Sequence, residues 1–460
     1  MEARAMDKAI PRVMLVGTGS GAGKTTVTCG ILRALMARGL SLSSFKCGPD
    51  YIDPMFHSRI IGACSSNLDL FLSGEETVRF LLAKNSADTD FSVIEGVMGM
   101  YDGLGFESDS YSSNHLALAT QTPELLIVNV KGMGLSLAAM LQGYRDFRQN
   151  NLQGVIFNGC TAGMYPVYRR LVNDTLGLRA YGYFPDIPQA AFESRHLGLV
   201  TADEVSLLQE KLDLLAHAAE ECIDLDGILS LGKNAPPLSY EDKWNNLARQ
   251  EPVRVAVARD KAFCFFYQDN LDLLERLGAE LLYFSPLTDS RVPKGASGLI
   301  LWGGYPEEYA KELSENTPML SSIKEAVQGK MPVIAECGGF MYLLERMTDR
   351  AGNAYEMAGA LPGECSMTKK LSRFGYLTLS ARNDNLLCKA GGKIPAHEFH
   401  YSDSTNNGCN MTAHKRGREW DCIHASNHLF AGYPHLHFAD KPELLQRFLM
   451  RCREYGKEQR

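Results

Sequence analysis

Residues 12–26 read RVMLVGTGSGAGKTT, an apolar run followed by a glycine-rich segment that ends in Lys-Thr-Thr. The apolar run 12–17 predicts a buried strand, and TTVTCGILRALMARGL (25–40) has apolar residues at helical spacing with Gly39 near its end. A glycine-rich loop between a strand and a helix is the setting of a P-loop, whose backbone N–H groups face phosphate oxygens. The stretch therefore predicts a nucleotide-binding domain.

The loop carries the side chains that phosphate binding requires. Lys24 supplies a positive charge for the outer phosphates, and the Thr25 hydroxyl is placed for Mg²⁺. The strict pattern GxxxxGK(S/T) has glycine at position 18, where this chain has threonine, so the loop is a variant. The candidate nucleotide-binding residues are Thr18, Gly19, Gly21, Gly23, Lys24, Thr25 and Thr26.

Three further apolar runs predict buried strands in the same domain, at 91–96, 124–130 and 152–159. Strands that alternate with helical stretches are typical of a doubly wound parallel sheet in an α/β fold. We expect the loops after these strands to gather at the edge of the sheet where such folds bind ligands.

Two of these loops are acidic, KCGPDYIDP (46–54) and EGVMGMYDG (95–103). Carboxylates beside a P-loop bind the metal of a nucleotide, so Asp50 and Glu95 are candidate Mg²⁺ ligands together with Thr25. Turn capping is the alternative role for each acid. The candidate acids of the two loops are Asp50, Asp53, Glu95 and Asp102.

The regular alternation of apolar runs and helical stretches stops around residues 225–252, which contain a Pro pair and show little hydrophobic periodicity. Beyond this segment, apolar runs alternate again with helical stretches, which predicts a second α/β domain. We expect a first domain at 1–230, a linker at 231–252 and a second domain at 253–460. The expected strands of the second domain are 253–260, 279–286, 297–304 and 331–339, with helices near 267–278 and 316–328.

A candidate thiol site lies in the second domain. IAECGG (334–339) places Cys337 where a strand gives way to a helix, a position that we expect to be exposed and to favour thiolate. LWGGYPE (301–307) ends another strand in a glycine pair, so the N–H groups of Gly304 and Gly338 are a candidate oxyanion hole. GYPHLHF (432–438) offers a histidine base far downstream. A nucleophilic Cys followed by a distant His along the chain is typical of a thiol amidase.

Composition narrows the function classes. A net charge of −7 argues against a general nucleic-acid binder, and the 12 cysteines form no CxxC pair, which disfavours a zinc ribbon or a redox dithiol. We find no signal peptide and no membrane-length apolar run, so we expect a cytoplasmic protein. One local basic pair, Arg195 and His196 in SRHLGL (194–199), either contacts an anionic substrate or packs at a helix end.

Together the motifs resemble the cobyrinic acid a,c-diamide synthase family over nearly the whole chain. The N-terminal half is similar to the dethiobiotin-synthetase branch of P-loop proteins, and the C-terminal half to class I glutamine amidotransferases. The resemblance therefore implies a P-loop amido-ligase domain followed by an amidotransferase domain. The matching segments are GTGSGAGKTT, FKCGPDYIDPMFHS, EGVMGMYDG, SRHLGL, GGYPEEY, ECGGFMYL, RFGYL, HEFHYS and GYPHLHF.

The resemblance also implies roles for individual residues. Cys337 would attack the carboxamide of L-glutamine with His435 as its base, while the position that usually holds an orienting Glu holds His437. The P-loop half would use Mg·ATP to phosphorylate carboxylates of a corrin substrate, cobyrinic acid, and ammonia would convert them to amides at positions c and a. HEFHYS (397–402) either shapes the glutaminase cleft or the interdomain face, or is ordinary sheet-and-turn packing. The residues implied on the substrate side are Asp50, Tyr51, Asp53, Glu95 and Asp102.

Several alternatives stay open at this point. The same chemistry can act on Ni-sirohydrochlorin or a hydrogenobyrinate, and cobyric acid synthase is a relative that amidates other carboxylates. A partition-type ATPase would lack the appended glutaminase. For partners we expect a small tetrapyrrole, no nucleic acid and no membrane, with the chain acting as a monomer or a homodimer.

Overall fold

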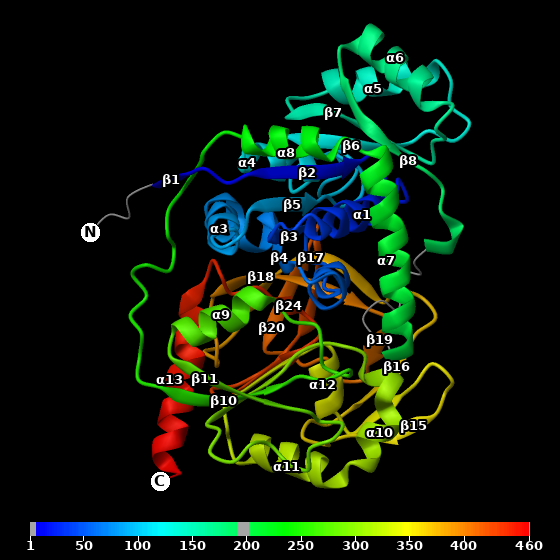
Figure 1. Cartoon of the computed structure of the whole chain (residues 1–460). Helices are drawn as coiled ribbons and strands as arrows, with labels where there is room; N and C mark the ends of the chain where they lie inside the picture. The colour runs from blue at the N-terminus through cyan, green and yellow to red at the C-terminus, as the bar shows by residue number, and fades with distance from the viewer. Residues whose placement is uncertain (1–5, 191–201, 460) are drawn as a thin grey trace. The chain divides into compact units, whose positions relative to one another are not determined.

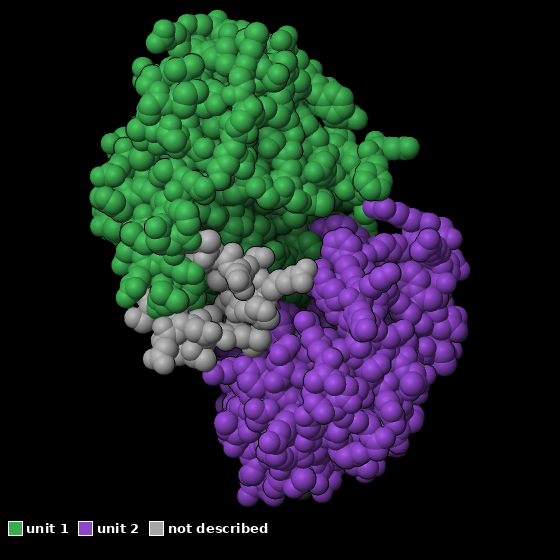
Figure 2. All heavy atoms as spheres, turned by 90° about the vertical axis from the view of Figure 1, so that its right-hand side faces the viewer, with its two compact units in different colours: residues 1–243 green, residues 244–460 purple. Residues whose placement is uncertain are grey.

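The computed structural model describes residues 6–190 and 202–459. The chain forms two compact units, 1–243 and 244–460, coloured separately in Figure 2. The boundary lies inside the predicted linker, but part of that segment has regular structure. Helix α8 (Leu225–Lys233) ends in it, and strand β9 (Leu238–Tyr240) pairs antiparallel with β1 (Met6–Lys8). Leu238 is buried, and this burial holds β9 in the first unit.

A seven-stranded parallel sheet forms the centre of the first unit (Figure 1). The four strands predicted in this half are present, and the fold class is confirmed. Residues Val13 to Val16 are all fully buried, which requires that both faces of the sheet be covered. In spatial order the strands are β4 (Cys64–Leu68), β3 (Leu42–Cys47), β5 (Phe91–Glu95), β2 (Arg12–Gly17), β6 (Glu124–Asn129), β7 (Leu152–Asn158) and β8 (Arg179–Phe184).

Helices connect the strands of this sheet. Helix α1 (Lys24–Ala37) packs along α7 (Ala202–Cys222), and Leu35 and Leu215 are fully buried in the core that they share. A short π-helical turn (His57–Ile61) continues α2 (Ile52–Phe56). The remaining helices of the unit are α3 (Leu70–Asn85), α4 (Ser113–Ala119), α5 (Ser136–Asp146) and α6 (Tyr165–Leu176).

The second unit is built on a six-stranded sheet whose strands are parallel except at one edge. Five of its strands are parallel, and β22 (His424–Ala425) pairs antiparallel with β23. The parallel strands are β11 (Ala279–Phe284), β10 (Val253–Ala258), β12 (Gly298–Leu301), β13 (Val333–Glu336) and β23 (Leu429–Gly432). The helices are α9 (Gln268–Arg276), α10 (Ala310–Glu315), α11 (Thr317–Gln328), α12 (Gly338–Leu343) and α13 (Pro442–Glu458).

Two smaller sheets, not expected from the sequence, complete the second unit. The larger one places β24 (His435–Leu436) against β18 (Lys393–His400). Its other strands are β17 (Arg373–Ala381), β20 (Met411–Lys415) and β21 (Arg418–Cys422). The smaller one contains β14 (Arg346–Thr348), β15 (Ala354–Glu356), β16 (Glu364–Met367) and β19 (Ser402–Ser404). Within the part of the chain that the structure describes, no helix has both the length and the apolar character to cross a membrane.

Candidate active sites

The P-loop joins β2 to α1, which begins at Lys24. Gly23 has φ 93°, a left-handed conformation that suits glycine, and a Cβ there would lie 2.0 Å from Nδ2 of Asn158. Asn158, the last residue of β7, donates 2.9 Å to the carbonyl of Ala22. The hydroxyl of Tyr144 donates 2.6 Å to the carbonyl of Thr18. Asn158 and Tyr144, for which the sequence analysis predicted no role, thus donate hydrogen bonds to backbone carbonyls of the P-loop.

Lys24 connects the P-loop to the loop that follows β5. Its Nζ donates to the carbonyls of Gly19 at 3.1 Å and Met98 at 2.5 Å. Burial and the nearby charge of Lys46 lower the pKa of Lys24. The predicted phosphate-binding lysine therefore lies among backbone carbonyls of both loops.

Three charged side chains meet behind the loop. Oε1 of Glu95 accepts from the Thr25 hydroxyl at 2.7 Å and from Nζ of Lys46 at 2.8 Å, and the same Nζ lies 2.6 Å from Oδ2 of Asp53. Burial favours a neutral amine, but Glu95 and Asp53 outweigh it and hold the pKa of Lys46 well above its ordinary value. The structure thus brings together Thr25, Glu95 and Asp53, and adds a cation that sequence reasoning missed.

The remaining acids of the two loops cap turns. Oδ1 of Asp50 accepts from the N–H groups of Ile52 and Asp53, at 2.8 and 3.3 Å, and Oδ2 of Asp102 accepts from Gly99 at 2.7 Å. Burial and the charge of Asp53 raise the pKa of Asp50 to about 6. Tyr51 lies directly before α2, between these acids in sequence. The alternative capping role is therefore observed for Asp50 and Asp102, and it leaves one carboxylate oxygen of each outside these bonds.

A buried histidine completes the cluster. Nδ1 of His57 lies 2.7 Å from the Ser44 hydroxyl, and its Nε2 lies 3.7 Å from Oε2 of Glu95. Burial lowers the pKa of His57 to about 4, so the ring is neutral at physiological pH. The sequence offered no signal for His57 beyond its place in the quoted segment FKCGPDYIDPMFHS. The basic pair Arg195 and His196 lies outside the described residues.

Cys337 forms the turn between β13 and α12. Its backbone has φ 46° and ψ −104°, a strained conformation that is typical of nucleophiles at strand-to-helix turns. Its N–H donates 2.8 Å to the carbonyl of Gly432, and the N–H of Gly338 donates to its sulfur. The expected exposure of Cys337 is wrong: the residue is 7 % exposed, and burial raises the pKa of its thiol. The structure therefore does not place the thiol in the exposed setting that would favour thiolate.

His435 lies beside Cys337. A Cβ placed on Gly303 would lie 2.6 Å from Cε1 of His435 and 3.5 Å from Cβ of Cys337, so the two side chains border the same small space. A Cβ on Gly338 would lie 3.1 Å from the nitrogen of Gly304, which places the two predicted oxyanion-hole residues next to each other. Burial lowers the pKa of His435 to about 4, which keeps its ring neutral at physiological pH.

The HEFHYS segment (397–402) contributes two rings near the dyad. His397 is the cross-strand partner of His435, and burial lowers the pKa of His397 to about 3. The ring of His400 stacks on Tyr433 with centroids 3.8 Å apart. Since paired residues in neighbouring strands share a face, this segment packs directly against the His435 strand.

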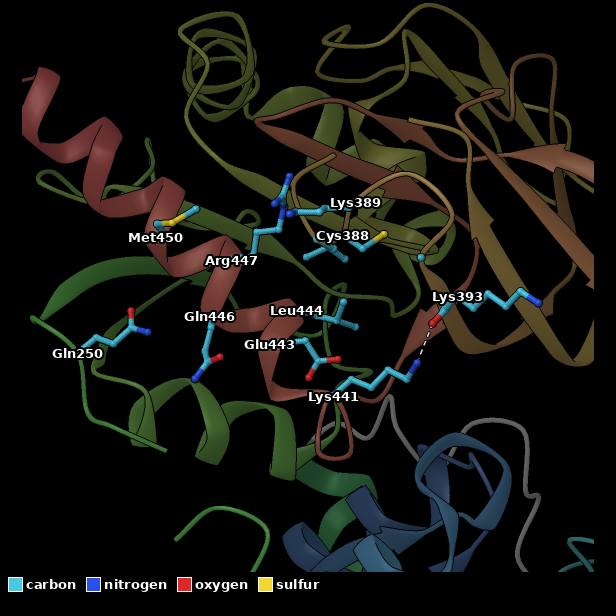
Figure 3. A pocket seen from close by; sticks show the side chains of 12 residues that line it. Gln250, Cys388, Lys389, Lys393, Lys441, Glu443, Leu444, Gln446, Arg447 and Met450 are labelled. Atoms are coloured by element: carbon cyan, nitrogen blue, oxygen red, sulfur yellow. Dashed lines mark hydrogen bonds between the residues drawn. The ribbon is translucent and has the colours of Figure 1, made fainter. Parts of the chain in front are cut away.

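A cavity of about 580 Å³ in the second unit is lined partly by the start of α13 (Figure 3). Neither Cys337 nor His435 lines it. Two of its cations are bonded to protein carbonyls, since Lys441 Nζ donates to Lys393 and Arg447 Nε to Asn385, each at 2.8 Å. The cavity is therefore separate from the thiol site.

Two family models match the two units. Residues 13–190 match a CobQ/CobB/MinD/ParA nucleotide-binding domain, and residues 254–443 match a CobB/CobQ-like glutamine amidotransferase domain. Cobyrinate a,c-diamide synthase of Caldanaerobacter subterraneus subsp. tengcongensis is 39 % identical, covering 97 % of this chain and 99 % of the relative. The enzyme of that name from Salmonella typhimurium is 39 % identical over 96 % and 98 % of the two chains. The Thermoplasma volcanium enzyme is 36 % identical over 98 % and 99 %.

The chain belongs to the cobyrinate a,c-diamide synthase family. Members of the cobyrinate a,c-diamide synthase family are amide-forming ligases, and the chain is therefore an enzyme of the ligase class. The predicted order, a P-loop domain followed by a glutamine amidotransferase domain, is confirmed by the two family models.

Proposed function

We propose that this enzyme amidates the a and c acetate carboxylates of cobyrinic acid in cobalamin biosynthesis, with ATP and L-glutamine as co-substrates. The observation that carries the proposal is identity of 39 % over 97 % of the chain to a relative named for this reaction. Two separate charged or nucleophilic clusters, one in each unit, supply the two chemistries that such a reaction needs.

The first unit activates the substrate. A carboxylate is a poor electrophile, so its oxygen attacks the γ-phosphorus of ATP, ADP leaves, and an acyl phosphate forms. Ammonia then attacks the acyl carbon and phosphate leaves. Lys24 and the loop amides Gly19, Gly21 and Gly23 hold the nucleotide phosphates, and Thr18 and Thr26 flank them. Lys46 provides a second fixed cation at the point where the phosphoryl group carries negative charge.

The residues at this point also fit Mg²⁺. Thr25 and Glu95 form the hydroxyl and carboxylate pair that such an ion binds in P-loop enzymes. Oε2 of Glu95 is fully buried and accepts no hydrogen bond from the described residues, which suits a cation ligand. We propose Thr25, Glu95 and Asp50 as the ligands, with Asp53, Tyr51 and Asp102 on the substrate side. The ion would neutralise phosphate charge during transfer.

The second unit releases ammonia. His435 accepts the thiol proton of Cys337, whose sulfur attacks the carboxamide carbon of glutamine. The N–H groups of Gly304 and Gly338 stabilise the negative oxygen of the tetrahedral intermediate. The intermediate collapses, His435 returns the proton to the leaving ammonia, and water hydrolyses the thioester to glutamate.

A direct assay tests the proposal. The protein is incubated with ATP, Mg²⁺, glutamine and, separately, cobyrinic acid, hydrogenobyrinic acid, Ni-sirohydrochlorin or cobyrinic acid a,c-diamide. Mass spectrometry then counts the amides formed, each of which lowers the mass by about one unit. Two amides on cobyrinic acid are expected. Amidation of the diamide instead would identify a cobyric acid synthase, and amidation of the nickel macrocycle alone would contradict the proposed substrate.

A further inference from the structure

A buried carboxylate lies against the catalytic imidazole. Glu336 is the last residue of β13 and immediately precedes Cys337. Its Oε2 lies 3.5 Å from Nδ1 of His435, and both side chains are almost completely buried. Residues 336 and 337 thus supply an acid and a thiol from one strand end, and both residues lie next to the same histidine.

The position of Glu336 is fixed by the backbone around it. The N–H of Leu436, the residue after His435, donates to the carboxyl group of Glu336, and burial raises the pKa of this group well above its ordinary value. Glu336 is also the register partner of Gly432 in β23, the strand that leads into His435. The carboxylate is therefore tied to the same short segment that carries the imidazole.

We propose that Glu336 is the positioning residue of the glutaminase, accepting the Nδ1 proton of His435 in a hydrogen bond so that Nε2 is left to take the thiol proton of Cys337. When His435 becomes an imidazolium ion, its positive charge favours the ionised form of Glu336, so that the contact becomes an ion pair and the 3.5 Å separation shortens. The inference rests on the proposed glutaminase function of the second unit and adds the third member of its triad.

His437 is the alternative candidate for the residue that orients His435, because it occupies the sequence position where an orienting Glu is usual. Its ring lies edge-on to Tyr267, with centroids 4.8 Å apart, and burial lowers its pKa. A buried neutral ring does not stabilise an adjacent imidazolium as a carboxylate does. Other titratable groups also lie around Cys337 and His435. The charge of His435 lowers the pKa of His397 and of His400, and the charges of Glu307 and Glu398 raise the pKa of Cys337.

The test separates charge from shape. Glu336→Gln keeps the length and a carbonyl for the Leu436 N–H but removes the charge, whereas Glu336→Asp keeps the charge on a shorter stem. Glutamine hydrolysis and iodoacetamide labelling of the Cys337 peptide, followed by mass spectrometry from pH 5.5 to 9, need no tetrapyrrole. For Glu336→Gln we expect kcat to fall roughly a hundredfold with KM nearly unchanged, and the labelling profile to move up by about one pH unit or more.

Glu336→Asp should retain more glutaminase than Glu336→Gln, and both should keep ammonium-dependent synthesis. The matched control is Glu124→Gln, which makes the same substitution at another fully buried acid in the first unit and should leave the labelling profile unchanged. A purely structural role predicts the opposite order, with the Gln variant better than the Asp variant, and would overturn the proposal. So would an unchanged labelling profile in Glu336→Gln.

If the Glu336 variants do not fold, a measurement on the unmodified enzyme still tests the proposal. The ¹⁵N shifts of His435 should show the proton of the neutral ring on Nδ1. A proton on Nε2 would contradict the proposed hydrogen bond. Failure of the proposed ligase function would appear separately, as absent synthesis from ammonium in the wild-type enzyme.

Discussion

The hydroxyl of Thr25 donates a 2.7 Å hydrogen bond to Glu95, joining the first turn of α1 to the last residue of β5. The bond aligns the helix that opens the P-loop with the strand that carries the buried acid. It also leaves Glu95 between a neutral hydroxyl and the ammonium of Lys46, at the place that we propose for phosphoryl transfer.

Neutralising Glu95 tests this cluster. Glu95→Gln keeps the shape but removes the charge, so synthesis should fall by on the order of a hundredfold or more, the scale of a lost electrostatic contact to a transferring phosphate. The Mg²⁺ concentration needed for half-maximal synthesis should rise. The measurement is amide formation over a Mg²⁺ titration, with glutamine hydrolysis in the same samples as the control. Normal turnover at low Mg²⁺ would contradict the assignment.

Removing the P-loop lysine should stop synthesis from either nitrogen donor. Lys24→Ala takes away the charge that holds the outer phosphates, and with it the activated carboxylate. Basal glutamine hydrolysis should persist, since Cys337 belongs to the other unit. Product amides are counted with glutamine and with ammonium chloride, and unchanged synthesis with either donor would refute the role of Lys24.

Removing the thiol should have the reverse effect. Cys337→Ala eliminates covalent attack on glutamine, so glutamine-dependent synthesis should be almost completely lost. Synthesis from ammonium should remain and should increase above pH 8, where more of the donor is free NH₃. The readout is product amides per ATP hydrolysed. Glutamine use at the wild-type rate would show that the nucleophile is another residue, and a folded variant inactive with ammonium would refute separable half-sites.

Adding one methyl group beside the dyad should disable the glutaminase. In Gly303→Ala the new Cβ would meet Cε1 of His435 at 2.6 Å, so the ring must shift. We expect glutamine hydrolysis to fall by on the order of a hundredfold, the usual effect of a misplacement of about 1 Å. The control is Gly134→Ala, where no atom lies within 4 Å of the added carbon. Equal glutaminase rates in the two variants would show that Gly303 does not set the position of His435.

The buried acid Glu124 should make stability depend on pH. Burial raises its pKa from 4.5 to about 8. Between these values the native protein holds a proton that the unfolded chain has released, so the free energy of unfolding should decrease as pH rises through this window. Glu124→Gln removes the titrating group and should flatten this dependence. Thermal unfolding at pH 5 and pH 8 measures this pH dependence. If the free energy of unfolding changes with pH equally in the variant and the wild type, Glu124 is excluded as the cause.

Local patterns in the sequence were enough to find both halves of the fold and most of the candidate residues. The strand, loop and helix around Lys24 and the strand-to-helix turn at Cys337 depend on short-range periodicity and on glycine placement, which a sequence displays directly. The family resemblance supplied the pairing of Cys337 with His435, because no local pattern links residues so far apart. The exposure of Cys337 was mispredicted, since burial depends on what the rest of the chain packs against it.

The amino-acid sequence alone predicts the main strands and helices of the two central sheets, the place of the phosphate loop and the thiol at a strand-to-helix turn. Only the tertiary structure decided which side chains meet: Lys46 between Glu95 and Asp53, Asn158 against the P-loop, and Glu336 beside His435. It also showed that β9, within the predicted linker, pairs with β1 at the other end of the unit. Each of these contacts joins segments that are distant in the chain, and their partners are chosen by sheet order, register and burial rather than by neighbouring residues.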